Sequence, residues 1–166
     1  MDNKFKIKKM IYASVFAAMI FVATAFLQIS GPTGYVHVGD GLIYYAACLL
    51  PFPYSAIAGA LGAGLADLYL GYAIWIIPTF IIKFCMSLFF TSKSDKILCF
   101  RNYIALAVGG FVNIAGYFIS ACIIYDWKIA LTDIPGNIIQ SVIAAAVFIL
   151  LALTSKIFGE RAKLNN

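Results

Sequence analysis

The stretch from Ala58 to Tyr72, "AGALGAGLADLYLGY", consists almost wholly of small and apolar residues, yet it carries an aspartate, Asp67. Ala60, Ala63 and Gly64 share one helical face with this aspartate. Such a face lets two helix backbones approach closely inside a membrane. The stretch therefore predicts a membrane helix whose carboxylate needs a partner or a function.

The composition of the whole chain supports this interpretation. Of the 166 residues, 63% are hydrophobic, 16% are aromatic and only 11% are charged. These few polar residues cannot cover a water-soluble globule of this size. We therefore expect an all-α integral membrane protein, a compact bundle of six transmembrane helices forming a single domain over residues 1–166. The expected spans are Met10–Ile29, Gly39–Leu50, Ser55–Leu70, Ala73–Phe90, Tyr103–Ile124 and Ile134–Phe158.

Two of these spans need comment. The second is short, and Pro51 and Pro53 break the chain after it, so both a full and a re-entrant second segment are compatible with the sequence. The first resembles a secretory signal that ends at "ATA" (residues 23–25), but because more spans follow we expect an uncleaved helix.

Basic residues are distributed unevenly around the six spans. Ten of the twelve Lys and Arg residues fall on one side of the predicted membrane, while Lys128 falls on the other and Lys83 lies inside a span. Because basic loops stay in the cytoplasm, both termini are expected there. The net charge of +5 then reflects topology and does not indicate nucleic-acid binding. The ten residues are Lys4, Lys6, Lys8, Lys9, Lys93, Lys96, Arg101, Lys156, Arg161 and Lys163.

Polar side chains inside the spans cost about 2 to 3 kcal/mol each on insertion scales. By helical rise they all fall in the outer half of the membrane, and several recur at helical spacing. We expect them to surround a small cavity that opens outward beneath the loop "SGPTGYVHV", Ser30–Val38. The alternative is that they only hydrogen-bond helix to helix. The predicted ligand contacts are Tyr35, His37, Asp40, Trp75, Thr79, Lys83, Asn113, Tyr117, Asn137 and Gln140.

Asp67 is expected to have a different role. It lies at the end of the small-residue face, so we expect it to hold a neighbouring helix, with Lys83 or backbone groups as partners. Contact with a ligand is the alternative.

Common catalytic and energy-converting motifs are missing from the sequence. It contains no G-x-x-x-x-G-K-[ST], no G-x-S-x-G and no H-E-x-x-H. His37 has no second ligand at metal-binding spacing, so we expect no metal and no cofactor. A buried site without an energy source suggests a receptor subunit powered by a partner. A stand-alone carrier, coupled to protons through Asp67 and Lys83, is the alternative, whereas an enzyme would need a nucleophile and base that we do not find.

Five segments, "ASVFA", "HVGDGLIYYAACLL", "AIAGALGAGLADLYLGY", "PTFIIKF" and "PGNIIQS", occur in this order between Ala13 and Ser141. Together they resemble the substrate-binding S components of energy-coupling factor (ECF) vitamin transporters. The pattern is similar to S components named for riboflavin or for hydroxymethylpyrimidine and pyridoxine. The acidic and aromatic loop pattern of typical riboflavin binders is missing, which leaves the choice among these vitamins open.

The resemblance implies a subunit of a bacterial cell membrane that binds a water-soluble vitamin from outside. It also implies docking on a transmembrane coupling protein, the T component, which is driven by two cytoplasmic ATPases. The docking motif A-x-x-x-A of the family matches Ala13 and Ala17, with the small residues Ser14 and Ala18 beside them. The alternative for this motif is a helix contact within the bundle. A pocket that offers stacking rings and amides suits a flat heteroaromatic molecule such as a pyridine, pyrimidine or flavin.

Overall fold

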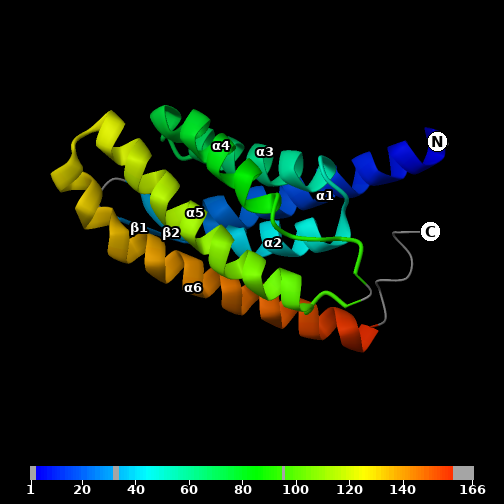
Figure 1. Ribbon diagram of the computed structural model, residues 1–166. Helices are drawn as coiled ribbons and strands as arrows, with labels where there is room; N and C mark the ends of the chain where they lie inside the picture. Colours follow the sequence, from blue (N-terminus) through cyan, green and yellow to red (C-terminus); the bar gives the residue numbers. More distant parts are fainter. Residues whose placement is uncertain (1–2, 32–33, 95, 159–166) are drawn as a thin grey trace.

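The computed structural model describes residues 3–31, 34–94 and 96–158, which form a bundle of helices with a small hairpin at one end (Figure 1). These residues contain six α-helices, one 3₁₀ turn and two strands. The six helical segments predicted from the sequence are thereby confirmed. In chain order the elements are α1 (Asn3–Phe26), β1 (Gln28–Ser30), β2 (Tyr35–His37), α2 (Gly39–Leu49), α3 (Tyr54–Tyr69), η1 (Ala73–Trp75), α4 (Ile76–Ser87), α5 (Phe100–Ile124) and α6 (Trp127–Phe158).

The predicted end of the first helix, Ile29, is three residues too late. In the structure α1 ends at Phe26, because residues 28–30 pair with residues 35–37 as an antiparallel hairpin, with Ser30 opposite Tyr35. The Gly31 N–H donates to the Gly34 carbonyl oxygen over 2.8 Å across the turn. The loop expected above the cavity is therefore partly a β-hairpin, which adds a small β element to an otherwise all-α fold.

The predicted start of the last helix, Ile134, is seven residues too late. Asp126 caps this helix, since its Oδ1 accepts from the backbone N–H groups of Lys128 and Ile129 at 2.6 and 3.0 Å. Pro135 therefore lies inside the helix and not in its first turn, where proline is common.

The six helices differ in length. Three of them, α1, α5 and α6, are long and apolar enough to cross a membrane. The 11 residues of α2 rise only about 16 Å, which is about half the thickness of a hydrocarbon core. Length and composition therefore support a membrane bundle, but not six complete crossings.

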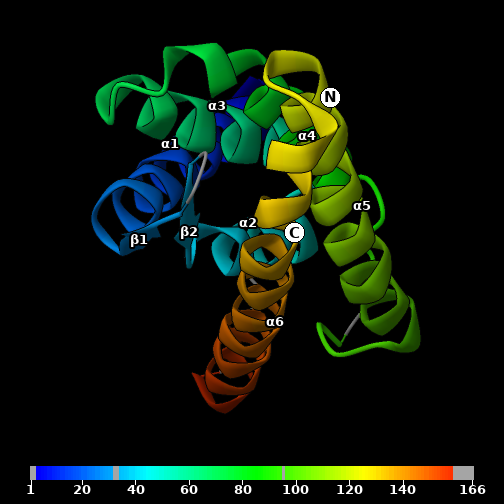
Figure 2. The same ribbon diagram turned by 90° about the vertical axis from the view of Figure 1, so that its left-hand side faces the viewer.

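Helix α2 lies at the centre of the bundle and packs against α1, α3, α4 and α6, as Figure 2 shows from the hairpin end. Small residues allow the closest contacts. A Cβ atom added to Gly62 of α3 would lie 2.6 Å from the Ala17 carbonyl oxygen of α1, and one added to Gly64, on the small-residue face, would lie 3.9 Å from the Ile76 carbonyl oxygen of α4. Different sides of α3 therefore approach α1 and α4. At the other end of α3, Gly71 adopts a φ of 84°, which favours glycine and turns the chain toward η1.

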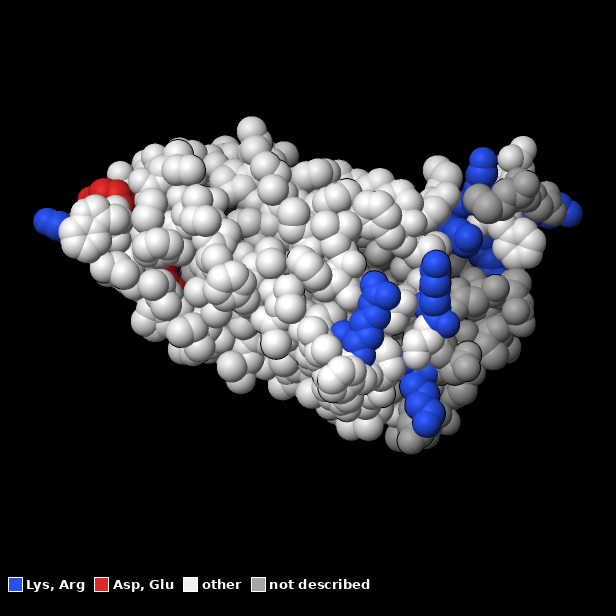
Figure 3. All heavy atoms as spheres, in the orientation of Figure 1, with Lys and Arg blue, Asp and Glu red and all other residues white. Residues whose placement is uncertain are grey.

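Most of the positive charge lies at one end of the molecule. Lys and Arg side chains gather where α1 begins, at the end opposite the hairpin (Figure 3). This end carries the lysines of the first turns of α1 and the basic residues of the α4–α5 connection. Of the predicted basic residues, Arg161 and Lys163 lie outside the described residues. The start of α1 and the end of α6 lie at the same basic end.

Candidate functional site

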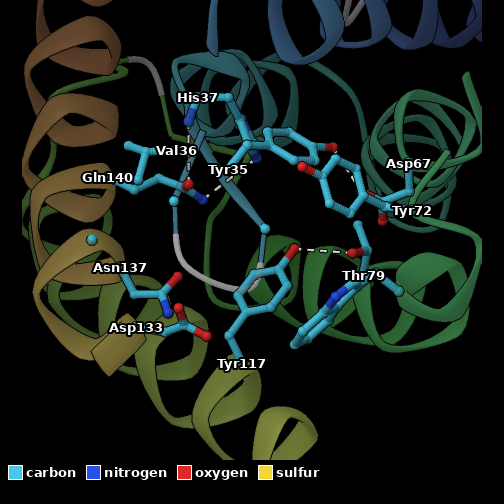
Figure 4. A pocket seen from close by; sticks show the side chains of 14 residues that line it. Tyr35, Val36, His37, Asp67, Tyr72, Thr79, Tyr117, Asp133, Asn137 and Gln140 are labelled. Atoms are coloured by element: carbon cyan, nitrogen blue, oxygen red, sulfur yellow. Dashed lines mark hydrogen bonds between the residues drawn. The ribbon is translucent and has the colours of Figure 1, made fainter. Parts of the chain in front are cut away.

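A pocket opens between the hairpin and the helix ends beside it, at the end of the molecule away from the basic residues (Figure 4). Side chains reach it from β2, α3, η1, α4, α5 and α6. The structure thus has a cavity beneath the first loop, where the sequence predicted one. Its lining residues are Gly31, Gly34, Tyr35, Val36, His37, Asp67, Tyr72, Trp75, Thr79, Tyr117, Asp133, Gly136, Asn137 and Gln140.

Aromatic rings supply much of the pocket wall. The rings of Trp75 and Tyr117 have centroids 5.7 Å apart and planes inclined by 51°. The Tyr117 phenol shares a hydrogen bond of 3.1 Å with the Thr79 hydroxyl, which holds the ring in place. Tyr35 and Tyr72 form a second pair, with centroids 5.3 Å apart. Two ring pairs from different elements therefore face one cavity.

Asp67 also lies in the pocket wall, where it binds the hairpin. The Tyr35 hydroxyl donates to Asp67 Oδ1 over 2.7 Å. Burial, with the negative charge of Asp67, raises the pKa of Tyr35 well above its usual value, so the phenol keeps its proton and remains a donor. The sequence predicted that Asp67 holds a neighbouring helix, with Lys83 as a possible partner. The structure instead places it against the first loop.

Lys83, Asp40 and Asn113 form a buried cluster below the pocket. Lys83 Nζ lies 2.8 and 2.9 Å from the two carboxylate oxygens of Asp40 and donates to Asn113 Oδ1 over 2.8 Å. All three residues are 0% exposed. A buried charge is tolerated when a partner neutralises it and hydrogen bonds satisfy it. These three predicted ligand contacts do not line the pocket, because their charges and amide satisfy one another.

Gln140 connects this cluster to the pocket and to the hairpin. Its Nε2 donates to Asp40 Oδ2 over 2.8 Å, and its Oε1 accepts from the backbone N–H of His37 over 3.2 Å. Lys83 Nζ also lies 4.9 Å from the ring centroid of Tyr117, which lines the pocket. The buried cluster therefore positions two residues of the wall above it.

His37 is held in the neutral state. Burial, aided by the positive charge of Lys83, lowers its pKa to about 4 against the opposing effect of Asp40. The Gly39 backbone N–H donates to Nδ1 over 3.1 Å, so the proton of the neutral ring is assigned to Nε2. The hairpin thus ends in an uncharged ring at the edge of the buried ion pair.

Two buried polar atoms of the lining residues have no hydrogen-bond partner among the described residues. They are Trp75 Nε1 and Asp67 Oδ2. Buried polar groups in folded proteins are nearly always paired. A molecule bound in the pocket can supply an acceptor for the indole and a donor for the carboxylate.

Seven of the ten predicted ligand contacts line the pocket, namely Tyr35, His37, Trp75, Thr79, Tyr117, Asn137 and Gln140. Among the lining residues that sequence reasoning missed are Tyr72 and Asp133. Asp133 lies four residues before Asn137, on the same helical face, but it fell outside the predicted last span. Tyr72 directly follows Gly71, the glycine of the turn after α3. This position beside a turn could have been recognised in the sequence.

Ala13 and Ala17, the predicted docking residues, are half-buried within α1. They pack against a core formed by residues of α1, α2 and α3, and the Ala17 carbonyl faces Gly62. The adjacent Ser14 and Ala18 are exposed. The side of the motif with Ala13 and Ala17 therefore makes a helix contact within the bundle, which was the alternative to docking. The side with Ser14 and Ala18 faces outward.

Comparisons with known proteins agree with this architecture. A family model described as the S component of ECF-type riboflavin transporters matches residues 4–156. A relative from Pyrococcus woesei, described as an uncharacterized protein in gap 3'region, is 29% identical over 126 residues, which cover 74% of this chain and 84% of the relative. Because the family match extends from α1 into α6, the chain belongs to the S components of the ECF-type riboflavin transporter family, a family of membrane-embedded, substrate-binding transporter subunits and not of enzymes.

Proposed function

We propose that this S component captures a flat heteroaromatic vitamin or precursor in the pocket beneath the hairpin, for ATP-driven uptake by partner subunits. The main observation behind this proposal is that stacking rings, amides and two unpartnered buried polar atoms converge on one cavity. Riboflavin is the first candidate because the family model carries its name. Hydroxymethylpyrimidine and pyridoxine offer the same combination of a flat ring and polar substituents.

The proposed binding mode combines stacking with directional hydrogen bonds. Trp75, Tyr117 and Tyr72 offer ring faces, and aromatic pairs contribute about 0.5–1.5 kcal/mol each beyond the area they bury. Asn137 and Gln140 offer amides from α6. Gln140 is already fixed by Asp40 and by the His37 backbone, so little conformational entropy is lost when a ligand binds there.

The direction of capture follows from the charge distribution. Basic residues gather at the end of the bundle opposite the pocket. By the positive-inside rule that end, with the start of α1 and the end of α6, faces the cytoplasm. The pocket then opens to the outside of a bacterial cell membrane, where a nutrient would be captured.

Uptake requires an energy source that this chain does not contain. We assign that role to a T component and two cytoplasmic ATPases, the partners that membership of the family implies. The outward side of α1 around Ser14 and Ala18 is the proposed docking surface, since small exposed residues let another helix approach closely.

Mass spectrometry of small molecules that remain bound through detergent purification tests this function. We expect a heteroaromatic vitamin or precursor in the extract, at a level that falls in a Trp75→Ala variant. The competing carrier hypothesis predicts uptake by this chain alone in liposomes, abolished when the proton gradient collapses. Such uptake would contradict the proposal. The structure offers this alternative little support, because Lys83 pairs with Asp40 and not with Asp67.

A further inference from the structure

The charged side chains of the pocket wall are all acidic. Asp67 and Asp133 line it, and no Lys or Arg is among the described lining residues. Residues 32 and 33, between the described parts of the chain, are Pro and Thr in the sequence and carry no positive charge. Asp67 comes from α3 and Asp133 from α6, and Figure 4 shows them on different sides of the cavity.

The buried cation closest to the pocket is not available to a ligand. Lys83 is 0% exposed, and its ammonium group already contacts both carboxylate oxygens of Asp40 and the amide oxygen of Asn113. To reach a ligand, it would have to leave Asp40 as an unpaired buried charge, which is strongly unfavourable.

Asp67, in contrast, forms no ion pair among the described residues. It is only 3% exposed, and its Oδ1 accepts a hydrogen bond from the neutral Tyr35 phenol. Its other oxygen, Oδ2, is buried without a hydrogen-bond partner among the described residues. A buried carboxylate in this state favours a ligand that brings a donor or a positive charge and opposes one that brings a second negative charge.

We propose that Asp67 is a ligand contact that sets the charge specificity of the site. Its Oδ2 accepts a hydrogen bond from a hydroxyl or ammonium group of the ligand, and the pocket takes uncharged or cationic forms while it excludes phosphate esters and other anions. This inference rests on the proposed function and deepens it. Like charges in one partly buried site repel strongly enough to weaken binding by at least about tenfold.

Matched ligand pairs test the inference with the full-length chain in detergent. The probes are riboflavin with riboflavin 5′-phosphate and pyridoxine with pyridoxine 5′-phosphate, each titrated at pH 7.5. We expect the unphosphorylated member of at least one pair to bind and its phosphate ester to bind at least about tenfold more weakly.

Two single variants separate the effect of Asp67 from net charge. Asp67→Asn keeps the size of the side chain and an acceptor for Tyr35, and should reduce the preference for the unphosphorylated form at least threefold. Asp126→Asn is the matched control: it removes the same charge at the same end of the molecule, does not line the pocket, and keeps a capping side chain for α6. Its preference should equal that of the wild type.

The possible outcomes are distinct. Equal affinity of the wild type for both members of the pair that binds would overturn the inference and leave the proposed function standing. An unchanged preference in folded Asp67→Asn would also overturn it. If that variant does not fold, the wild-type preference decides alone. Binding of no member of either pair would overturn the proposed function for these vitamins, and the inference with it.

Discussion

Lys83 of α4 and Asp40 of α2 form an ion pair with Nζ–O distances of 2.8 and 2.9 Å, at a point where neither residue is exposed. The pair joins the central helix to a helix of the pocket wall. Through Gln140 it also reaches α6 and the hairpin. We therefore interpret it as the rigid support beneath the pocket.

Removing one member of this pair should destabilise the fold. Lys83→Met leaves the Asp40 carboxylate buried without its cation, which typically costs about 3–5 kcal/mol. Thermal unfolding in detergent should show a lower midpoint. The double variant Lys83→Met/Asp40→Asn should recover part of the loss, because it removes the stranded charge. A wild-type midpoint for Lys83→Met would contradict the supporting role.

The bond between Tyr35 and Asp67 predicts a kinetic effect. Tyr35→Phe keeps the ring but removes a hydrogen bond to a carboxylate, a class that contributes about 1.5–3 kcal/mol. We expect the hairpin to open more easily and the bound vitamin to dissociate about ten- to a hundredfold faster in stopped-flow experiments. Tyr103→Phe, which changes an exposed ring outside the pocket, is the control. Equal dissociation rates would show that this bond does not hold the hairpin closed.

His37 predicts how stability depends on pH. Its pKa is lowered to about 4 in the folded protein, whereas an unperturbed histidine has a pKa near 6.5. Above about pH 6.5 both states are neutral, so stability is constant. As the pH falls from 6.5 toward 4, the unfolded state takes up the proton first and stability decreases. Because the sequence contains one histidine, His37→Gln should flatten this part of the curve. An unchanged slope would show that other titratable groups cause the loss of stability in this pH range.

The two sides of the α1 motif should respond differently to added bulk. Ala17→Phe should impair folding, because Ala17 packs against the core and its backbone meets Gly62 of α3. Ala18→Phe changes an exposed position and should leave vitamin binding intact. In cells that contain the partner subunits, it should reduce ATP-dependent uptake strongly. Normal uptake by Ala18→Phe would remove this surface from the docking interface.

Much of the architecture could be predicted because membrane helices have a strong, local sequence signal. Apolar runs ended by Pro51, Pro53 and the turn after Leu70 located the six helical segments. Helical spacing also placed Trp75 and Thr79 on one side, and both line the pocket. The start of α6 was missed because the cap, Asp126, precedes a proline that itself resembles a helix start.

Pairing between distant residues was harder to predict. Asp40, Asp67 and Lys83 are three buried charges, and one cation cannot satisfy two carboxylates that lie apart. The sequence suggested Asp67 as a partner of Lys83, but the fold brings Asp40 to it. The phenol that binds Asp67 comes from a hairpin 32 residues earlier in the chain, and no periodicity reports such a contact.

Equilibrium titration of the purified wild-type chain and its Asn137→Ala variant with riboflavin, pyridoxine and hydroxymethylpyrimidine, without ATP, tests the binding site most directly. We predict saturable binding of at least one vitamin with a dissociation constant of roughly nanomolar to micromolar. Asn137→Ala should weaken it by about 1–3 kcal/mol, whereas Ile138→Ala, a change at an exposed neighbour, should not. Saturable binding that Asn137→Ala leaves unchanged, or no binding of any of the three, would contradict the account.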